Sequence, residues 1–493
     1  MAIIGEKITL DKPLVGNIAR NQMESKMELT TRGALYVGTG QANSVTPDGG
    51  GDAVPIPITS HIAPNGADDN GKVLVADSAS EVGWRIDTGS FKTGTSAYRK
   101  TSNTVLALGQ PFLETDTGNL FVGKTGTEKL KDLTLDDCYL SYREFKRLQE
   151  VYGVDLVGSE NPNALVRTEA ARDLNVTVGN SEITSDFDNC YPWSDIEEVT
   201  DEFGNVFIKI PKFYSKITKN SDGTYKHQLS GMKHEGFDTL FKVGTKEIDY
   251  VMVGKYEGSY NSDKMYSKSG QAPKTQCHRD ESRRWCRAHG AGYQQYDFLI
   301  DLIIKELWLV EMKTTNCQSI MYGYANNNSN KITTGTTDSV ATPSGSPVSN
   351  SDGKHACKYR GIENPWGNIS IWCDGIAYHD NLIYLSTNPN KYYQSPFTGD
   401  SYKNYGAKVK TDGFVKIVAP LEEGSLIQYV TNAGGSATTG YCDKYLYSGN
   451  YMTCGGSWKS AGDAGLWCWN NNHAGESDYE ATDGGRLCYK PPV

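Results

Sequence analysis

The last stretch of the chain, residues 440–493, most constrains what this sequence can build. It contains nine aromatic residues and nine glycines but only four leucines, isoleucines or valines. Aliphatic side chains usually fill a self-contained core, so this segment needs support from the rest of the chain. Tyrosine, tryptophan, serine, glycine and asparagine together supply rigid amphipathic contact area beside adaptable hydrogen bonding. We therefore expect the segment to form a binding surface that other parts of the chain hold in place.

Length and charge exclude several classes of protein. The 493 residues suffice for two or more domains with separate cores. A net charge of −10 without a basic stripe disfavours a nucleic-acid partner. No apolar run reaches the length of a bilayer helix, and the N-terminus lacks the pattern of a secretory signal, so we expect no membrane insertion. Eleven cysteines without regular spacing fit synthesis in a reducing cytoplasm. Such a chain with an exposed binding face suggests assembly into a particle that lysis releases.

The first third of the chain carries an internal repeat. The run Leu29–Gly38 returns as Leu113–Gly123, with a fainter copy at Gly71–Ala76. Each copy has a turn signal followed by a short β-rich run, which is typical of β-hairpins. One such unit cannot bury its apolar face alone, whereas three units in one chain, or three chains around an axis, can. We therefore predict an all-β N-terminal attachment segment over 1–57 and a hairpin-repeat trimerisation region over 58–132.

Residues 133–184 differ in character from the repeats. Tyr142–Tyr152 and Ala164–Leu174 have the apolar spacing of short helices. This pattern predicts a helical connector between the N-terminal region and the rest of the chain.

Residues 185–493 are expected to form one α+β domain. Val206–Ile210, Tyr250–Gly254 and Phe414–Val418 are predicted strands, and Arg279–His289 is a predicted basic helix that ends at Gly290. A second helix has an apolar stripe with five members, which are Leu299, Leu302, Ile303, Leu307 and Val310. Asp301 and Lys305 are expected to pair on the solvent side of that helix. The polar tract Asn326–Gly353 is predicted to be an exposed insertion.

Several motifs in this domain occur in an order that resembles a known family. They are Phe207-Ile-Lys-Ile-Pro-Lys-Phe-Tyr214, Arg283–Tyr293, Gly455-Gly-Ser-Trp458, Ala464-Gly-Leu-Trp467, Asn470–Asn472 and Gly484-Gly-Arg486. The domain resembles the C-type-lectin-like domains of phage tail proteins, in the branch of that fold that includes the formylglycine-generating enzymes. The C-terminus is similar to the variable region of tropism-determinant proteins that retroelements diversify. The run Glu114–Gly123 resembles the trimeric β-prism region of the same family.

The resemblance implies a phage tail receptor-binding protein without enzymatic activity or cofactor. Such a protein would be trimeric, made in the host cytoplasm and placed in the virion at the tail tip. Its partners would be a bacterial surface receptor and phage tail or baseplate proteins, and a diversity-generating retroelement would vary its C-terminal residues. Glycan and protein receptors both remain open, and so do calcium dependence and a purely structural role in the tail or baseplate.

The same resemblance divides the segment 445–489 into contact and structural positions. The implied receptor-binding residues are Asn450, Tyr451, Lys459, Asp463, Trp467, Trp469, Asn471, Asn472, His473, Asp478 and Tyr479. The implied structural residues are Gly455, Gly456, Trp458, Gly465, Gly484 and Arg486. Trp467 and Trp469 lie two residues apart, so on an extended segment both would lie on one face, as an exposed aromatic pair or as core. Their codons cannot arise from an asparagine codon by changes at adenines alone, which departs from the family's pattern of diversification.

The rival function is an oxidase of the same fold branch. Those enzymes use two cysteines after the Gly-Gly-Ser-aromatic motif, and the corresponding positions here are Ser460 and Gly465. Without thiolates at these positions that chemistry does not run. Cys277, His278, Cys286 and His289 do not have the spacing of a structural zinc site. Glu363-Asn-Pro-Trp366 has residues of a calcium-dependent sugar site in the wrong order, so we predict no metal.

Overall fold

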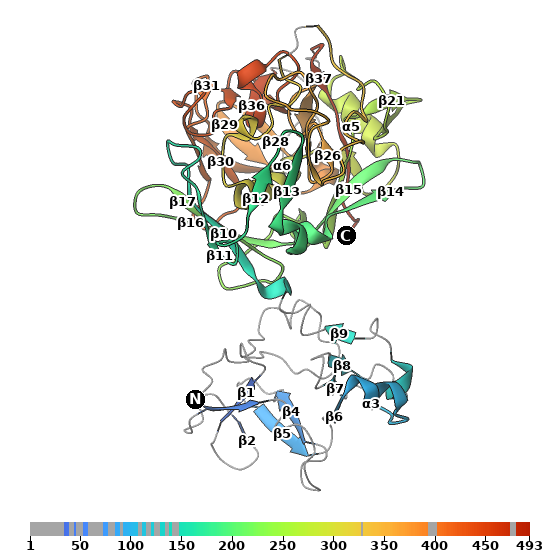
Figure 1. Cartoon of the computed structure of the whole chain (residues 1–493). Coiled ribbons are helices and arrows are strands. Elements are labelled where there is room, and N and C mark those ends of the chain that lie inside the picture. The colour runs from blue at the N-terminus through green and yellow to red at the C-terminus, as the bar shows by residue number, and fades with distance from the viewer. Residues whose placement is uncertain are drawn as a thin grey trace. The chain divides into compact units, whose positions relative to one another are not determined.

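The structure is a computed structural model that divides into two compact units. Unit 1 contains residues 1–150 and 232–234, and unit 2 contains residues 151–231 and 235–493 (Figure 1). Both are mostly β-sheet with few helices. The described residues are 34–38, 44–45, 53–57, 72–76, 84–88, 92–106, 111–114, 120–122, 129–133, 138–140, 147–326, 329–392, 402–473 and 480–493.

Small sheets make up the described part of unit 1. They are the pair β1 (Ala34–Gly38) with β3 (Ala53–Pro57), the order β2 (Ser44–Val45), β5 (Trp84–Thr88), β4 (Lys72–Ala76), and the order β6 (Lys92–Gly94), β7 (Pro111–Glu114), β8 (Leu120–Val122), β9 (Cys138–Leu140). The β-rich runs of the sequence repeat are strands. In the last copy, β7 and β8 pair antiparallel with Phe112 opposite Phe121. In the first copy, β1 instead pairs with β3, a strand further along the chain.

A compact apolar cluster lies beside α3 (Ser96–Thr101) in unit 1. The cluster consists of Leu106, Phe112, Phe121, Leu130 and Leu133. Thr95 begins the helix, because its side-chain oxygen accepts a hydrogen bond of 3.1 Å from the Tyr98 amide. Arg99 is buried, forms an ion pair with Glu114 and lies 4.7 Å from the centre of the Phe121 ring. A cation thus forms part of a small core in a region that the sequence predicted only as repeated hairpins.

The prediction of a helical connector over 133–184 is wrong from Val151 onward. Residues 147–149 are helical and residues 141–146 lie outside the described part of the chain, while β10 (Val151–Val157) begins inside the helix predicted over 142–152. The second predicted helix is replaced by β11 (Val166–Glu169), which pairs antiparallel with β10. The division between the two units falls between Glu150 and Val151. From Val151 onward this stretch therefore belongs to unit 2, where pairing with neighbouring strands overrides its local helical pattern.

Two large sheets organise unit 2. The five-stranded sheet has the order β14 (Glu197–Thr200), β15 (Val206–Pro211), β20 (Tyr250–Gly254), β38 (Leu487–Tyr489), β23 (Tyr293–Gln295). The six-stranded sheet has the order β31 (Gly413–Phe414), β34 (Lys444–Leu446), β36 (Gly465–His473), β35 (Tyr451–Gly455), β27 (Ser370–Cys373), β37 (Asp483–Gly484). The strands predicted at 206–210 and 250–254 are present, whereas the one predicted at 414–418 is split between β31 and β32. The C-terminal segment contributes strands to both sheets, which explains how it folds with few aliphatic side chains.

Six further sheets, one of them also five-stranded, complete the described part of unit 2. They are β11, β10, β17 (Tyr225–Ser230), β16 (Tyr214–Lys219); β12 (Val176–Val178), β13 (Glu182–Ser185), β24 (Ser344–Gly345), β25 (Lys358–Tyr359), β26 (Ile362–Glu363); β28 (Ile376–His379), β29 (Leu382–Leu385), β30 (Lys403–Ala407); and the pairs β18 (Lys242–Val243) with β19 (Lys246–Glu247), β21 (Ser259–Asn261) with β22 (Lys264–Tyr266), and β32 (Ile417–Pro420) with β33 (Gln428–Asn432).

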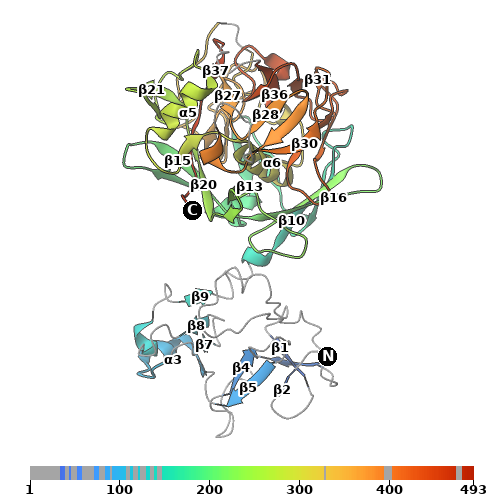
Figure 2. The ribbon, with the colours of Figure 1, turned by 180° about the vertical axis from the view of Figure 1, so that it is seen from behind.

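Helix α6 (Phe298–Met312) lies in the middle of unit 2 in both ribbon views (Figures 1 and 2). Asp297 begins it by accepting a hydrogen bond of 3.0 Å from the Ile300 amide. All fifteen residues of the helix are buried. The predicted pairing of Asp301 with Lys305 is therefore confirmed, but the prediction that the pair faces solvent is wrong. The two side chains form an ion pair, but they are only 3% and 1% exposed because β-strands cover that face as well.

Helix α5 (Arg279–Arg287) and the polar tract after α6 complete the unit. The helix is followed by Gly290, whose positive φ of 123° suits a glycine. The prediction that the tract 326–353 is exposed is wrong for its middle part. Thr337 is fully buried, and its amide and hydroxyl donate to the Glu363 carboxylate at 2.8 and 2.7 Å. A buried acceptor therefore orders this part of the tract. In the part of the chain that the structure describes, no helix is long and apolar enough to cross a membrane.

Candidate functional site

The candidate contact segment is built on the hairpin of β35 and β36. β36 is an inner strand of its sheet, because it pairs antiparallel with β35 and parallel with β34. Side chains from Gly465 to Trp469 are buried without alternation, so both faces of this strand are covered. The sequence places its aromatic residues on this strand, and the fold makes them core.

Trp469 lies against α6. Its ring is fully buried, stacks on Tyr429 with centroids 5.0 Å apart, and donates from Nε1 to the Asp301 carboxylate at 3.0 Å. Lys305 Nζ lies 4.8 Å from the centre of the same ring. Trp467 is 1% exposed and packs against Tyr441. An exposed aromatic pair at 467 and 469 is therefore ruled out in this structure, because the sheet and α6 enclose both indoles.

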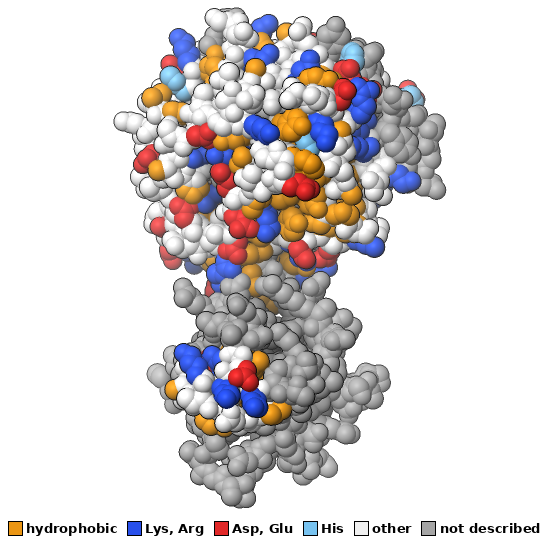
Figure 3. Space-filling model, turned by 90° about the vertical axis from the view of Figure 1, so that its right-hand side faces the viewer, with side chains coloured by type: hydrophobic (Ala, Val, Ile, Leu, Met, Phe, Trp, Pro, Cys, Tyr) orange, Lys and Arg blue, Asp and Glu red, His pale blue; other side chains and the backbone are white. Residues whose placement is uncertain are grey.

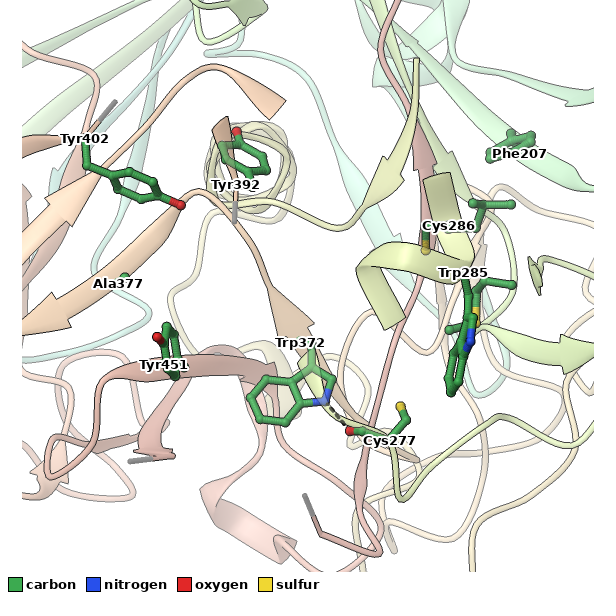
Figure 4. Packing of buried hydrophobic residues seen from close by; sticks show 11 residues of the cluster. Phe207, Cys277, Trp285, Cys286, Trp372, Ala377, Tyr392, Tyr402 and Tyr451 are labelled. Atoms are coloured by element: carbon green, nitrogen blue, oxygen red, sulfur yellow. Dashed lines mark hydrogen bonds between the residues drawn. The ribbon is translucent and has the colours of Figure 1, made fainter. Parts of the chain in front are cut away.

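Tyr451, Asn471 and His473 are also buried, which corrects their assignment to an exposed contact set. Tyr451 belongs to an apolar cluster with Trp372, Tyr392 and Tyr402 (Figure 4). Asn471 donates from Nδ2 to the Tyr429 hydroxyl at 2.8 Å.

The His473 ring packs edge-on against Trp372, and its Nε2 lies 3.6 Å from the Asp483 carboxylate. Burial raises the pKa of Asp483 to about 7, and the nearby charge of Glu480 adds to the rise. Residues of the predicted receptor-binding set thus serve as core groups between β27, β35 and β37.

The remaining predicted contacts fall into two separate groups. Asn472 is exposed and Asn450 half-buried at one end of the hairpin, where Asn450 N donates to His473 O at 2.7 Å. Lys459 is exposed and Asp463 half-buried in the turn between β35 and β36, at the other end. β36 has nine residues, and a strand of that length spans roughly 25 Å. Asp478 and Tyr479 lie outside the described residues.

Hydrogen bonds fix the backbone under both groups. At the first end, Ser448 donates from its hydroxyl to Asn472 Oδ1 at 2.6 Å. At the second end, Ala461 N donates to Ala325 O at 2.8 Å, and Gln318 Nε2 donates to Ala461 O at 2.9 Å. The exposed side chains are therefore carried on ordered loops. Ser448 is a contact candidate that the sequence reasoning missed, and its place two residues before Asn450 was the available signal.

The glycines of this segment admit groups that a side chain would displace. A Cβ at Gly465 would lie 2.1 Å from Asp443 Oδ1, so only glycine fits against that carboxyl group. Asp443 Oδ2 accepts a hydrogen bond of 2.8 Å from the Trp467 amide. Burial raises the pKa of Asp443 well above its usual range, against the lowering effect of that amide. Asp443 thus anchors the beginning of β36, a role that its sequence context does not reveal.

Arg486 joins three separate parts of unit 2. The side chain is 2% exposed and donates to four backbone carbonyls, those of Gly254, Lys255, Glu363 and Asn364. Its charge also favours the ionised form of Glu257, although burial is the larger effect and raises the pKa of Glu257 to about 8. Trp458 is 4% exposed, and its amide donates to Asn368 O at 3.0 Å. Both residues act below the surface.

Cys454 and Cys468, the cysteines nearest the Gly455-Gly-Ser-Trp458 motif, have the surroundings of core residues. Cys454 and Cys468 are buried, and burial raises the pKa of each thiol above its usual value. The positions that correspond to the oxidase cysteines, Ser460 and Gly465, lie in the turn and at the beginning of β36. Neutral, enclosed thiols are poor nucleophiles and poor redox groups.

The residues weighed as metal ligands also have structural surroundings. Cys277 and Cys286 lie in the apolar cluster, and His289 Nε2 contacts Met265 O at 2.6 Å. Among the residues the structure describes, no three His, Cys, Asp or Glu side chains are grouped to hold a metal ion.

A row of half-buried side chains crosses the five-stranded sheet of β14, β15, β20, β38 and β23 in unit 2. Lys209, Met252, Tyr489 and Tyr293 follow one another in register across β15, β20, β38 and β23, and all four are half-buried. Figure 3, on the side of β14, β15 and α5, shows hydrophobic side chains gathered in the lower part of this unit. Sequence reasoning missed the row because its members come from four distant segments.

Comparison with known proteins gives structural neighbours alone. No protein-family model and no curated protein matches the sequence. Similar solved chains include three described as Major Tropism Determinant, the P3c, I1 and U1 variants. The identities are 8%, 9% and 9%, the TM-scores 0.23, 0.20 and 0.20, and the matches cover 81% of this chain and 98%, 99% and 99% of theirs. We therefore argue function from the residues of this chain.

Proposed function

We propose that the chain is a receptor-binding adhesin of a phage tail. Unit 2 would be its C-type-lectin-like binding domain, and unit 1 would attach the protein to the tail and assemble the trimer. The receptor would lie on a bacterial surface, and three copies would convert a weak affinity at each site into useful avidity. The order of the family-like motifs along the chain, from Phe207 to Arg486, supports this assignment.

One observation carries the proposal. The motif residues of the C-terminal segment, such as Trp458, Trp469 and Arg486, are buried, while polar residues of the interchangeable set remain accessible at both ends of the hairpin. This arrangement lets contact groups change without disturbing the core. The proposed contact set consists of Asn450, Lys459, Asp463 and Asn472 from the sequence prediction, Ser448 from the structure, and Asp478 and Tyr479 from the sequence alone. Retroelement diversification would act on these contact positions.

Exchanging charges at one end of the hairpin is expected to reduce adsorption to bacteria without loss of stability. The variant Lys459→Glu with Asp463→Lys keeps the net charge but inverts the local pattern on an exposed turn. Surface changes of this kind alter unfolding free energies by about 0.5 kcal/mol or less, whereas contacts at the centre of an interface contribute more. Labelled full-length chain, bound to a panel of bacterial strains, should lose at least about tenfold in apparent affinity, which corresponds to about 1.4 kcal/mol.

A matched exchange elsewhere provides the control. Lys219 and Glu202 are exposed and lie outside the C-terminal segment, so Lys219→Glu with Glu202→Lys should adsorb like the unchanged chain. Asn472→Arg tests the other end of the hairpin separately. Equal adsorption of all these variants to a strain that binds the unchanged chain would refute the contact assignment. Adsorption to cells treated with periodate or with protease then distinguishes a glycan receptor from a protein.

A further inference from the structure

A buried cation lies under the first group of contact residues. Lys408 directly follows β30, and its residue is 6% exposed. Its ammonium donates to the backbone carbonyls of Tyr447 and Gly449, the latter at 2.8 Å. The rings of Tyr378 and Tyr447 flank the ammonium, with centroids at 4.7 and 5.9 Å. Ser448 lies between the two bonded carbonyls, so one side chain holds both sides of that residue.

This ammonium has no counter-ion within the described residues, since none of their carboxylates forms an ion pair with it. Asp412 is nearby along the chain, and its Oδ1 accepts the Tyr447 amide at 2.9 Å. The Tyr378 hydroxyl donates to Tyr429, and His379 pairs with Asp380 on an exposed turn. A buried charge without an opposite charge is costly, so its bonds to the loop must offset part of that cost.

We propose that Lys408 is the positioning residue of the loop 447–450. Its ammonium fixes the two carbonyls around Ser448 and thereby sets the path on which Ser448 and Asn450 reach the surface. Two hydrogen bonds from one nitrogen to two carbonyls suit this task, because they restrict both peptide groups together, and a neutral amine keeps the two N–H donors that these bonds need. That the loop contacts a receptor rests on the function proposed above, whereas its positioning by Lys408 does not.

The charge state of Lys408 makes the equilibrium between the closed and the open loop 447–450 depend on pH. Burial lowers the pKa of Lys408 from 10.5 to about 8 in the closed loop. If the loop opens, the ammonium returns to water and regains its usual pKa. Between these two values the open loop binds more protons than the closed one, so rising pH favours the closed loop. The ratio of closed to open loop should therefore increase by up to about tenfold per pH unit in that window.

Hydrogen exchange of the free full-length chain tests the proposal directly. Protection factors of the amides 447–450 are measured by mass spectrometry between pH 7 and pH 10 and corrected for intrinsic exchange rates. The unchanged chain should gain protection as the pH rises. Lys408→Arg keeps the charge but does not titrate here, so its protection should be independent of pH. Lys408→Met removes the donors and should lower protection at least about tenfold at pH 7, because two carbonyls lose their partner.

Contrary outcomes separate this proposal from the proposed function. Equal or greater protection of the loop in Lys408→Met, or the same pH profile in Lys408→Arg as in the unchanged chain, would overturn the positioning role. If Lys408→Met does not fold, the comparison with Lys408→Arg still decides. Both measurements use the free chain, so a failure of receptor binding leaves their result intact.

Discussion

Trp469→Ala should unfold with a free energy about 3–5 kcal/mol below that of the unchanged chain, the range found when a large buried aromatic side chain is truncated. The ring is fully buried, stacks on Tyr429 and lies between β36 and α6. Its removal leaves a cavity and leaves an oxygen of buried Asp301 without its indole donor. Denaturant unfolding followed by far-ultraviolet circular dichroism measures the loss.

Two comparisons make this prediction specific. Trp469→Phe keeps most of the stacking area but removes the Nε1 hydrogen bond, so its loss should be smaller than that of the alanine variant. Lys459→Ala, on the exposed turn of the same hairpin, should unfold within about 0.5 kcal/mol of the unchanged chain. If Trp469→Ala is as stable as Lys459→Ala, the indole is not a core group and the buried framework described above is wrong.

Arg486→Met should lower the unfolding free energy by about 3–5 kcal/mol, the range for removing one member of a buried charge cluster. The substitution leaves four buried carbonyls without their shared donor and removes the positive charge that most favours the ionised form of Glu257. Arg486→Lys should also be unstable, since an ammonium cannot satisfy four carbonyls as a planar guanidinium does. Chemical unfolding at pH 6 measures both losses.

The defect of Arg486→Met should grow with pH. The pKa of Glu257 is raised to about 8 in the folded chain, so the stability linked to its protonation is present below 4.5 and is lost as the pH rises through 8. Without Arg486 the carboxyl group becomes still harder to ionise, so the two chains differ more at pH 9 than at pH 6. Double substitution with Glu257→Gln should remove this extra loss. An equal defect at both pH values would show that Arg486 acts on the carbonyls alone.

Local patterns were sufficient to predict the elements whose environment is simple. The β-rich runs at 206–210 and 250–254 form strands, and the apolar stripe through Leu302 and Val310 forms α6. Local sequence patterns gave wrong predictions where contacts with distant segments determine the secondary structure or the burial of a residue. Helical spacing predicted helices over 142–152 and 164–174, yet β10 begins at Val151 and pairs with β11 on one side and β17 on the other. The face of α6 that was predicted to be exposed to solvent carries the ion pair of Asp301 with Lys305, but only the complete fold shows that strands cover this face.

The contact segment shows the same limit. Its composition correctly indicated that other strands must support it, because β27, β20 and β23 pair with its strands. Composition could not show that β36 is an inner strand, which buries Trp467, Trp469, Asn471 and His473. Aromatic residues near glycines serve equally well in a binding surface or in a core covered on both faces. Lys408 and Asp443 escaped prediction because their partners are distant in the sequence and are mostly backbone groups.

A saturation library over residues 445–489, scored both for folding and for adsorption, tests the central claim most directly. Folding is read from protease resistance of the full-length chain, and adsorption from binding to a bacterial strain that captures the unchanged protein. Most substitutions at Ser448, Lys459, Asp463 and Asn472 should keep the fold and change adsorption, while those at Trp469 should destroy the fold. If the folded variants adsorb equally well whichever residue occupies these exposed positions, the account is contradicted.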